Sequence, residues 1–295
     1  MKKSMILAFL ILSFSFLCTS PYNPFQAGGI GGGGVIISQF YIKPSEIYTG
    51  GIAYLIVVLK NTGNYNVNNA NLLIYGFDPS DWSVNEENNK LIVKTSSFNL
   101  RGKNFAFNIP GGETKFVFVL KNKMKLPADQ ELPYTFYGRL CYNYETTAYG
   151  KVKIVNENEL VRENINPKNA EIPLNTGNAP IAVYVKGPQP LVENAGKLSF
   201  VIKIKNVGNG FVGSGCGGSD NNYNWVKVTV KLGNKEVGST KKVYLRKGEE
   251  AEFPITVDLS GEATSIPKGT IGIRVDVSYP YYEDAKATVI VKSPE

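Results

Sequence analysis

The chain has 295 residues, 43% of them hydrophobic and 19% charged, which is enough length and apolar content for two domains with buried cores. It contains no histidine, and this excludes every Ser-His, Cys-His and His-ligated metal mechanism. The net charge of +7 is interspersed with acidic and apolar residues, so we expect a solvated surface and no nucleic-acid partner.

The N-terminus is typical of an exported protein. Lys2 and Lys3 precede an uncharged apolar run from Met5 to Cys18, which matches the charged and hydrophobic regions of a secretory signal. As a helix this run is too short for the roughly 30 Å hydrocarbon core of a bilayer. We therefore predict a signal peptide at residues 1–20, a secreted or cell-surface location, and membrane contact only through this segment.

The end of the signal allows two interpretations. Cys18 stands where the lipidated cysteine of a lipoprotein would be, but bulky Phe16 and Leu17 precede it, whereas lipidation requires small residues there. Cleavage between Cys18 and Ala27 is the favoured alternative to lipidation of Cys18. Residues 21–34 end in a stretch that is nearly all glycine, and we predict a flexible spacer there.

The rest of the chain contains an internal repeat with a spacing of about 140 residues. Three motifs recur in the same order: Lys60–Asn64 and Lys205–Asn209, Gly112-Glu113 and Gly248-Glu249, and the tyrosine pairs Tyr142/Tyr144 and Tyr279/Tyr281. This order predicts one domain type that occurs twice, at residues 35–155 and 178–295. Residues 156–177, rich in Asn and acidic residues, are predicted to be an extended linker.

Both copies consist of short alternating segments bounded by Gly, Asn, Asp and Pro, without a sustained helical period. In the second copy, strands are predicted near residues 181–186, 197–205, 225–232, 241–245, 251–258, 270–279 and 285–292. The first copy is expected to add a strand or hairpin around Lys90–Thr95. Seven strands at this spacing predict an all-β fold of two tandem antiparallel immunoglobulin-like β-sandwiches.

These motifs resemble the CARDB-like (cell-adhesion-related) and other immunoglobulin-like domains of secreted archaeal and bacterial surface proteins. The residues that carry the resemblance are the K-N-x-G-N strand ends, the G-E turns and the closing Tyr-rich strands, and together they cover nearly the whole chain after the signal. The resemblance implies adhesion or assembly at the cell surface without catalysis. It supplies no catalytic, cofactor-binding or metal-binding residues, so we expect no enzyme and no cofactor.

The expected partner is a protein, either a second copy of this chain or another surface protein, and a glycan is the other candidate. Two further functions stay open. One is a structural subunit of an extracellular filament or virion, in which the apolar segment Val35–Phe40 or an apolar outer face of the first domain docks on a neighbour. The other is a glycan-binding or accessory module. Asp78 and Asp81, next to Trp82, suggest a sugar site, but Asp before Pro79 is ordinary turn chemistry.

After Cys18, two cysteines remain, Cys141 and Cys216. The alternation along residues 271–279 places Ser278, the counterpart of Cys141, on the outward face of its strand. An exported protein rarely leaves an exposed thiol unpaired. A disulfide between Cys141 and Cys216, an intermolecular disulfide and free thiols are the three alternatives.

Comparison of the copies also predicts an apolar outer face on the first domain. In the second copy, Leu198 and Phe253 belong to the inward rows of two neighbouring strands, and the outward rows are mostly polar. The matching outward positions of the first copy are apolar: Tyr54, Ile56, Val58, Phe116, Phe118 and Leu120. Monomers seldom expose such a face, so we expect it to be covered by residues 35–42, the Lys90 hairpin, the second domain or a partner.

Overall fold

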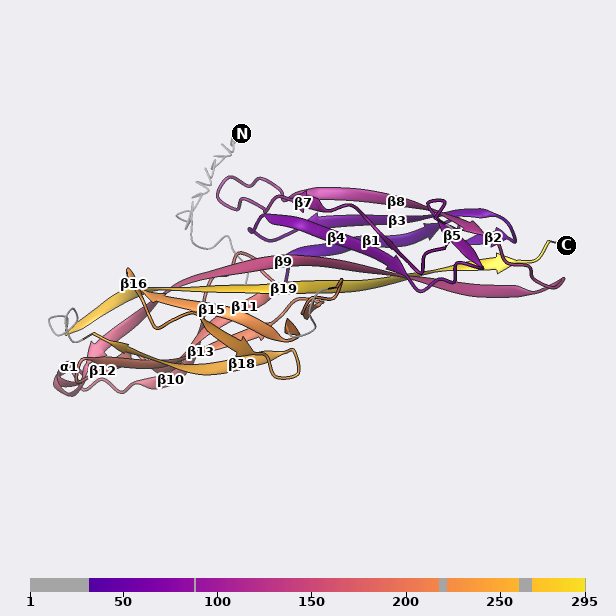
Figure 1. Cartoon of the computed structure of the whole chain (residues 1–295). Coiled ribbons are helices and arrows are strands. Elements are labelled where there is room, and N and C mark those ends of the chain that lie inside the picture. The colour runs from indigo at the N-terminus through magenta and orange to yellow at the C-terminus, as the bar shows by residue number, and fades with distance from the viewer. Residues whose placement is uncertain (1–31, 88, 218–221, 260–266, 295) are drawn as a thin grey trace, which may run out of the picture.

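The computed structural model describes residues 32–87, 89–217, 222–259 and 267–294. These residues are mostly β-strand with a single short α-helix, which confirms the all-β prediction. Figure 1 shows an elongated molecule in which two lobes are built on two long strands, β9 (Glu131–Asn156) and β19 (Lys268–Lys292). The predicted signal peptide with Cys18, and residues 21–31 of the predicted spacer, lie outside the described residues.

Strands β9 and β19 form one antiparallel ladder, which we call the ribbon. Its register runs from Glu131 opposite Lys292 to Val155 opposite Lys268, so all 25 residues of β19 are paired. Residues of one face are buried along both lobes, among them Phe136, Leu140, Tyr144, Val152, Ile273, Val277, Tyr281 and Val289. In Figure 1 the first lobe lies above the ribbon and the second below it, so the ribbon's twist turns this one face toward both cores.

The first lobe has two layers. One is a four-stranded sheet in the order β1 (Val35–Lys43), β3 (Ile52–Asn61), β8 (Glu113–Asn122), β5 (Trp82–Val84). The other is the ribbon, with β4 (Val67–Tyr75) beside β9 and the short β2 (Glu46–Tyr48) beside the end of β19. Strands β6 (Ile92–Lys94) and β7 (Phe98–Leu100) extend this layer by pairing with β4.

The second lobe repeats this plan. One layer contains β10 (Lys168–Pro173), β11 (Ile181–Gln189), β13 (Lys197–Asn206) and β18 (Glu250–Asp258). The other is the ribbon with β14 (Phe211–Val212), β15 (Trp225–Leu232), β16 (Lys235–Glu236) and β17 (Lys241–Tyr244). Strand β12 (Leu191–Asn194) joins the layers because it pairs with both β13 and β9.

Each repeat therefore lends a strand to the other lobe. Strand β9 starts beside β4 in the first lobe and ends beside β12 in the second, whereas β19 starts beside β15 and ends beside β2. The ranges 35–155 and 178–295 are thus not self-contained units, and the strands predicted at 270–279 and 285–292 are one strand. Alternation is a local pattern, so it does not reveal in which lobe a strand finds its partner.

Two segments predicted to be extended or flexible are ordered by packing. The predicted linker forms α1 (Glu157–Arg162), whose N-cap Asn156 accepts a hydrogen bond from the amide of Glu159, and then β10, which pairs with β11. At the end of the predicted spacer, Gly33 and Gly34 are buried. A Cβ on Gly33 would lie 2.4 Å from the side chain of Asn178, so only glycine fits there.

The K-N-x-G-N repeat has a structural explanation. The Asn61 side chain donates to the carbonyls of Tyr65 (2.8 Å) and Leu100 (3.1 Å) and accepts from the amide of Gly63. Asn206 makes the equivalent contacts, to the carbonyls of Gly210 and Gly248 and from the amide of Gly208. These two asparagines satisfy the backbone of the loops that follow β3 and β13, which is why the motif occurs twice.

We predict that Asn61→Ala destabilises the protein more than Asn206→Ala. Asn61 is completely buried, so its removal leaves two carbonyls and an amide without partners, at a cost of about 2–4 kcal/mol; Asn206 is half-buried, and water replaces part of its bonding, so the cost is about 1–2 kcal/mol. Urea unfolding of both variants measures the difference. Equal losses of unfolding free energy in the two variants would contradict the expectation that the more deeply buried asparagine contributes more.

Truncation after Asp284 tests the strand exchange, because it removes the part of β19 that completes the first lobe. The chain has two tryptophans, one per lobe: Trp82, which is buried, and Trp225. In a Trp225→Phe background we expect the truncation to shift Trp82 emission to longer wavelength and open Trp82 to acrylamide quenching. If the truncation instead perturbs Trp225 in a Trp82→Phe background and spares Trp82, the lobes do not share strands.

Candidate functional site: the outer face of the first sheet

The four-stranded sheet of the first lobe has an apolar outer face, but half of its predicted members lie elsewhere. Tyr54, Ile56 and Val58 are on the outer side of β3, as predicted, with Tyr54 46% exposed and Val58 9% exposed. On β8, however, Phe118 and Leu120 are buried in the core, and Phe116 packs against it. The prediction for Phe116, Phe118 and Leu120 is therefore wrong.

The error is a slip of one residue between the repeats. Glu113 lies opposite Lys60 in the first lobe, and Glu250 lies opposite Lys205 in the second. Glu113 thus corresponds to Glu250 and not to Glu249, because the second copy has one more residue in the turn before β18. A one-residue shift moves every side chain of a strand to the other face.

The outer residues of β8 are nevertheless apolar as well. Val117, 49% exposed, lies opposite Ile56, and Val119 lies opposite Tyr54. Tyr41 of β1 lies opposite Ile56 on the other side, so Tyr41, Ile56 and Val117 form one row across three strands. We call Tyr41, Ile52, Tyr54, Ile56, Val58, Val117 and Val119 the outer face.

Lysines surround this apolar centre. Lys43 and Lys115 lie on β1 and β8 in the rows on either side of the Tyr41–Val117 row, and Lys121 lies opposite Ile52. Among the described residues, Lys60 forms an ion pair with Glu113 (3.9 Å), whereas Lys43, Lys115 and Lys121 form none. The outer face is thus an apolar patch with a positively charged rim, which favours a partner surface that carries carboxylates at its edge.

Strand β1 forms one edge of this sheet and is held from below by the ribbon. The Tyr142 hydroxyl donates to the carbonyl of Val35 (2.9 Å), and the amide of Ile37 donates to the Glu283 carboxylate (3.4 Å) next to a bulge in β1. Burial, together with a smaller effect of the nearby Asp284, raises the pKa of Glu283 to about 7, although the hydrogen bond from the Ile37 amide opposes the shift. A carboxyl that titrates near neutral pH therefore lies under the edge strand.

Cys141 and Cys216 form a disulfide with a Cα–Cα distance of 5.9 Å. Cys141 lies on the outward face of the ribbon, as its repeat position predicted, and the bond fastens the loop after β14 to the middle of the ribbon. Arg139 makes further contacts at this level of the ribbon. Its guanidinium donates two hydrogen bonds to the Asp284 carboxylate (2.6 and 2.7 Å) and one to the carbonyl of Gly215 (3.1 Å).

On the inward face at the same level, four tyrosines gather where the lobes meet. Tyr142 is 5.7 Å from Tyr281 and Tyr144 is 6.0 Å from Tyr279, measured between ring centroids. The Tyr279 hydroxyl is hydrogen-bonded to Thr146 (2.7 Å) and the Tyr281 hydroxyl to Asn206 (3.1 Å). Burial raises the pKa of all four hydroxyls, that of Tyr281 to about 12, so they stay neutral core groups and offer no stacking surface.

The carboxylates next to Trp82 make a local turn. Asp78 accepts hydrogen bonds from the amide and hydroxyl of Ser80 (both 2.8 Å), and these bonds lower the pKa of Asp78. Trp82 is completely buried and lies edge-on to Phe136 at 5.0 Å. This tryptophan therefore presents no platform for a sugar.

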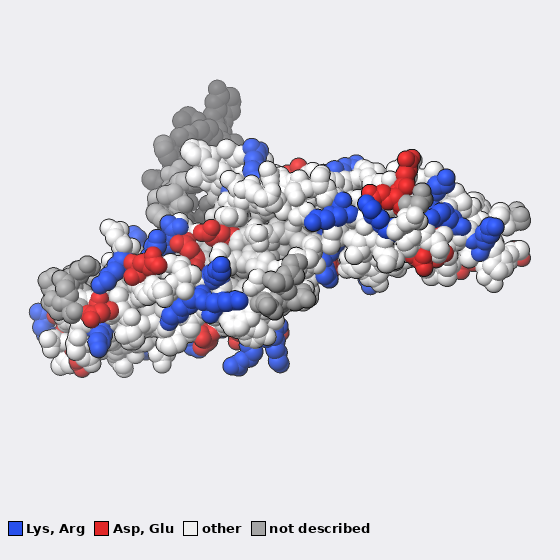
Figure 2. All heavy atoms as spheres, viewed as in Figure 1, with Lys and Arg blue, Asp and Glu red and all other residues white. Residues whose placement is uncertain are grey.

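Charged groups of both signs are interspersed over the face shown in Figure 2. Within the described ranges, no three Asp, Glu, Cys or His side chains gather closely enough to hold a metal ion. In the same residues, no helix is long and apolar enough to span a bilayer.

No protein-family model and no curated protein matches this sequence. Among solved structures, the chain is similar over 87% of its length to red sea bream transglutaminase (9% identity, TM-score 0.19). It is also similar over 84% to the C-terminal globular domain of an oligosaccharyltransferase from Pyrococcus abyssi (12%, 0.20) and over 90% to the CupB6 tip adhesin from Pseudomonas aeruginosa (8%, 0.18). It spans 31%, 45% and 97% of those chains, and TM-scores this low carry no argument about fold or function.

The Glu283 carboxyl generates a pH prediction. Because its folded pKa of about 7 exceeds the ordinary value of 4.5, the folded state binds the proton more tightly, and its contribution to stability is full below about pH 4.5 and lost as the pH rises through 7. For this half-buried group we expect the loss to be about 1–2 kcal/mol. Glu283→Gln should flatten the pH profile of urea unfolding in this range, and Glu145→Gln, on the outward face, should not. A profile unchanged by Glu283→Gln would contradict the assignment.

Proposed function

We propose that this chain is an exported, non-catalytic cell-surface protein that works by adhesion or assembly through two immunoglobulin-like β-sandwich lobes. The observation that carries the proposal is the outer face, where Tyr54, Ile52 and Val117 are each 46–49% exposed on one sheet. Single exposed apolar residues are ordinary, but a contiguous row over three strands is typical of an interaction surface.

The disulfide between Cys141 and Cys216 supports the exported location, because such bonds persist in oxidising compartments. The apolar run after Lys2 and Lys3 supports the same location from the sequence.

The lysine rim limits how the outer face engages a partner. In a symmetric dimer that paired two outer faces, Lys43, Lys115 and Lys121 of one copy would approach those of the other, which repulsion disfavours. The face therefore suits another surface protein, or a different and acidic surface of a second copy. If the outer face binds a different surface of a second copy, the contact repeats from copy to copy in a head-to-tail chain. Such a chain supports the alternative function, a structural subunit of an extracellular filament or virion.

Strand β1 favours the filament alternative for a separate reason. Among the described strands it pairs along its edge only with β3, and it directly follows the Gly-rich segment. An edge strand that is paired on one side only can exchange with the same strand of a neighbour.

Changing Ile56 and Val117 together to lysine tests the outer face. Both side chains point away from the core, so we expect the thermal midpoint to stay the same, whereas association in sedimentation velocity and retention of the exported protein on its producing cells should both be lost. Phe118→Lys is the matched control. Phe118 is next to Val117 in the chain but is buried, so a lysine at this position should unfold the lobe.

The proposal fails if the wild-type protein neither associates nor remains on the cell surface. It also fails if the double variant assembles and is retained like the wild type. Loss of association together with a lower thermal midpoint would show that the face is internal cover rather than an interface.

A further inference from the structure

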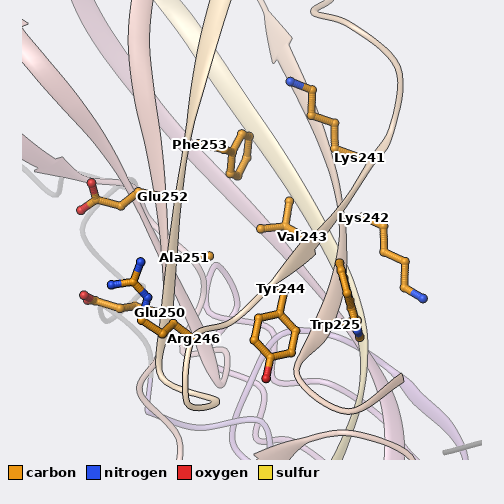
Figure 3. A pocket seen from close by; sticks show the side chains of 10 residues that line it. All are labelled: Trp225, Lys241, Lys242, Val243, Tyr244, Arg246, Glu250, Ala251, Glu252 and Phe253. Atoms are coloured by element: carbon orange, nitrogen blue, oxygen red, sulfur yellow. The ribbon is translucent and has the colours of Figure 1, made fainter. Parts of the chain in front are cut away.

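The second lobe contains an open cleft of about 920 Å³, which is the size of a ligand site. It lies at the edge of the lobe where β17 ends one layer and β18 ends the other, so no strand of the described residues closes the gap between them. Figure 3 shows Val243 of β17 and Phe253 of β18 pointing toward each other across it. Both pack against the core from the open side and give the cleft an apolar floor.

Aromatic rings line the outer rim of the cleft, on the opposite face of β15 and β17 from Val243. Trp225 and Tyr244 lie opposite each other on β15 and β17, with ring centroids 5.2 Å apart and planes at 62°. Tyr244 is 49% exposed, whereas buried Trp82 is 0% exposed. The face of an aromatic ring carries partial negative charge and attracts the C–H groups of a sugar ring.

Two lysines lie on the β17 side of the cleft, whereas Arg246 lies in the turn toward β18, where its amide donates to the carbonyl of Glu250 (2.8 Å) (Figure 3). The Lys242 amine is 5.0 Å from the centre of the Trp225 ring, the Lys241 amine is 5.9 Å from that of Phe253, and Arg246 follows β17 in the chain. Ion pairs among the described residues do not include these three cations. The carboxylates of the opposite wall are already paired, Glu252 with Lys186 (3.0 Å) and Glu250 with Lys203 (3.5 Å).

We propose that this cleft binds an acidic polysaccharide, whose sugar rings lie on the apolar floor and the aromatic rim while its carboxylate, sulfate or phosphate groups face Lys241, Lys242 and Arg246. Charge complementarity selects the ligand, because the anionic groups of the wall are neutralised and those cations are not. The site is in the second lobe and is separate from the outer face, so the inference goes beyond the proposed function.

The strand edges themselves argue against an extended peptide as the ligand. Strand β17 has only four residues, and the free edge of β18 contains Pro254, which has no amide proton to donate to an added strand. A peptide that bound here would have to rely on side chains alone.

Isothermal titration calorimetry with oligogalacturonate, sulfated dextran and neutral dextran of similar length tests the proposal on the full chain. We expect at least one acidic saccharide to bind, with an affinity that falls as salt rises, and neutral dextran not to bind measurably. Tyr244→Ala and the double variant Lys241→Gln/Lys242→Gln should each weaken binding by about tenfold or more without changing the thermal midpoint. Comparison of sulfated dextran with oligogalacturonate distinguishes recognition of sulfate groups from recognition of carboxylates.

Tyr149→Ala is the matched control, since Tyr149 is also 49% exposed and also lies beside a cation, with Arg274 5.5 Å from its ring, but outside the cleft. It should bind like the wild type. Absence of binding to both acidic saccharides, equal binding of neutral dextran, or equal binding of polyglutamate overturns the proposal. An unchanged affinity of Tyr244→Ala, or an equal loss in Tyr149→Ala, also overturns it. Assembly through the outer face is measured separately, so either idea can fail alone.

Discussion

The antiparallel ladder between β9 and β19 is the interaction on which the rest of the molecule depends. Its strands contribute the same face to both cores, so neither core is complete without both strands. The partners are more than 100 residues apart in sequence (Glu131 opposite Lys292), and closing such a loop is entropically costly before any pair forms. Burial along the whole ribbon offsets that cost, which couples the stability of the two lobes.

The middle of the ribbon carries the contacts that keep the lobes in one arrangement. On the inward side the tyrosines of both repeats pack together, and the Tyr142 hydroxyl holds the start of β1. On the outward side Arg139 joins Asp284, and the disulfide fixes the loop near Cys216. Because polar bonds and apolar packing coincide here, a hinge at this level would have to break both. The shared ladder favours a rigid rod over two domains on a flexible linker.

Such a rod would hold two chemically different surfaces at a fixed separation. The outer face of the first lobe is apolar with a lysine rim, which suits a protein surface. The cleft of the second lobe joins aromatic rings to unpaired cations, which suits an anionic chain of sugars. A molecule that contacts a protein with its first lobe and a saccharide with its second would be well placed to attach one surface component to another.

Local rules in the sequence determined the β class, the repeat and much of its turn chemistry. The absence of histidine excluded whole mechanisms, the K-N-x-G-N motif marked the loops that Asn61 and Asn206 stabilise, and alternation placed Cys141 outward. Only the tertiary structure decided the facing of Phe118, the partner of Cys141, the packing of residues 157–173 and the lobe in which β19 ends. The cleft beside Trp225 was equally hidden, because its walls come from strands that meet only in the folded lobe. The physical reason is that period-two alternation reports which residues share a face, whereas register and strand partners depend on pairing between distant segments.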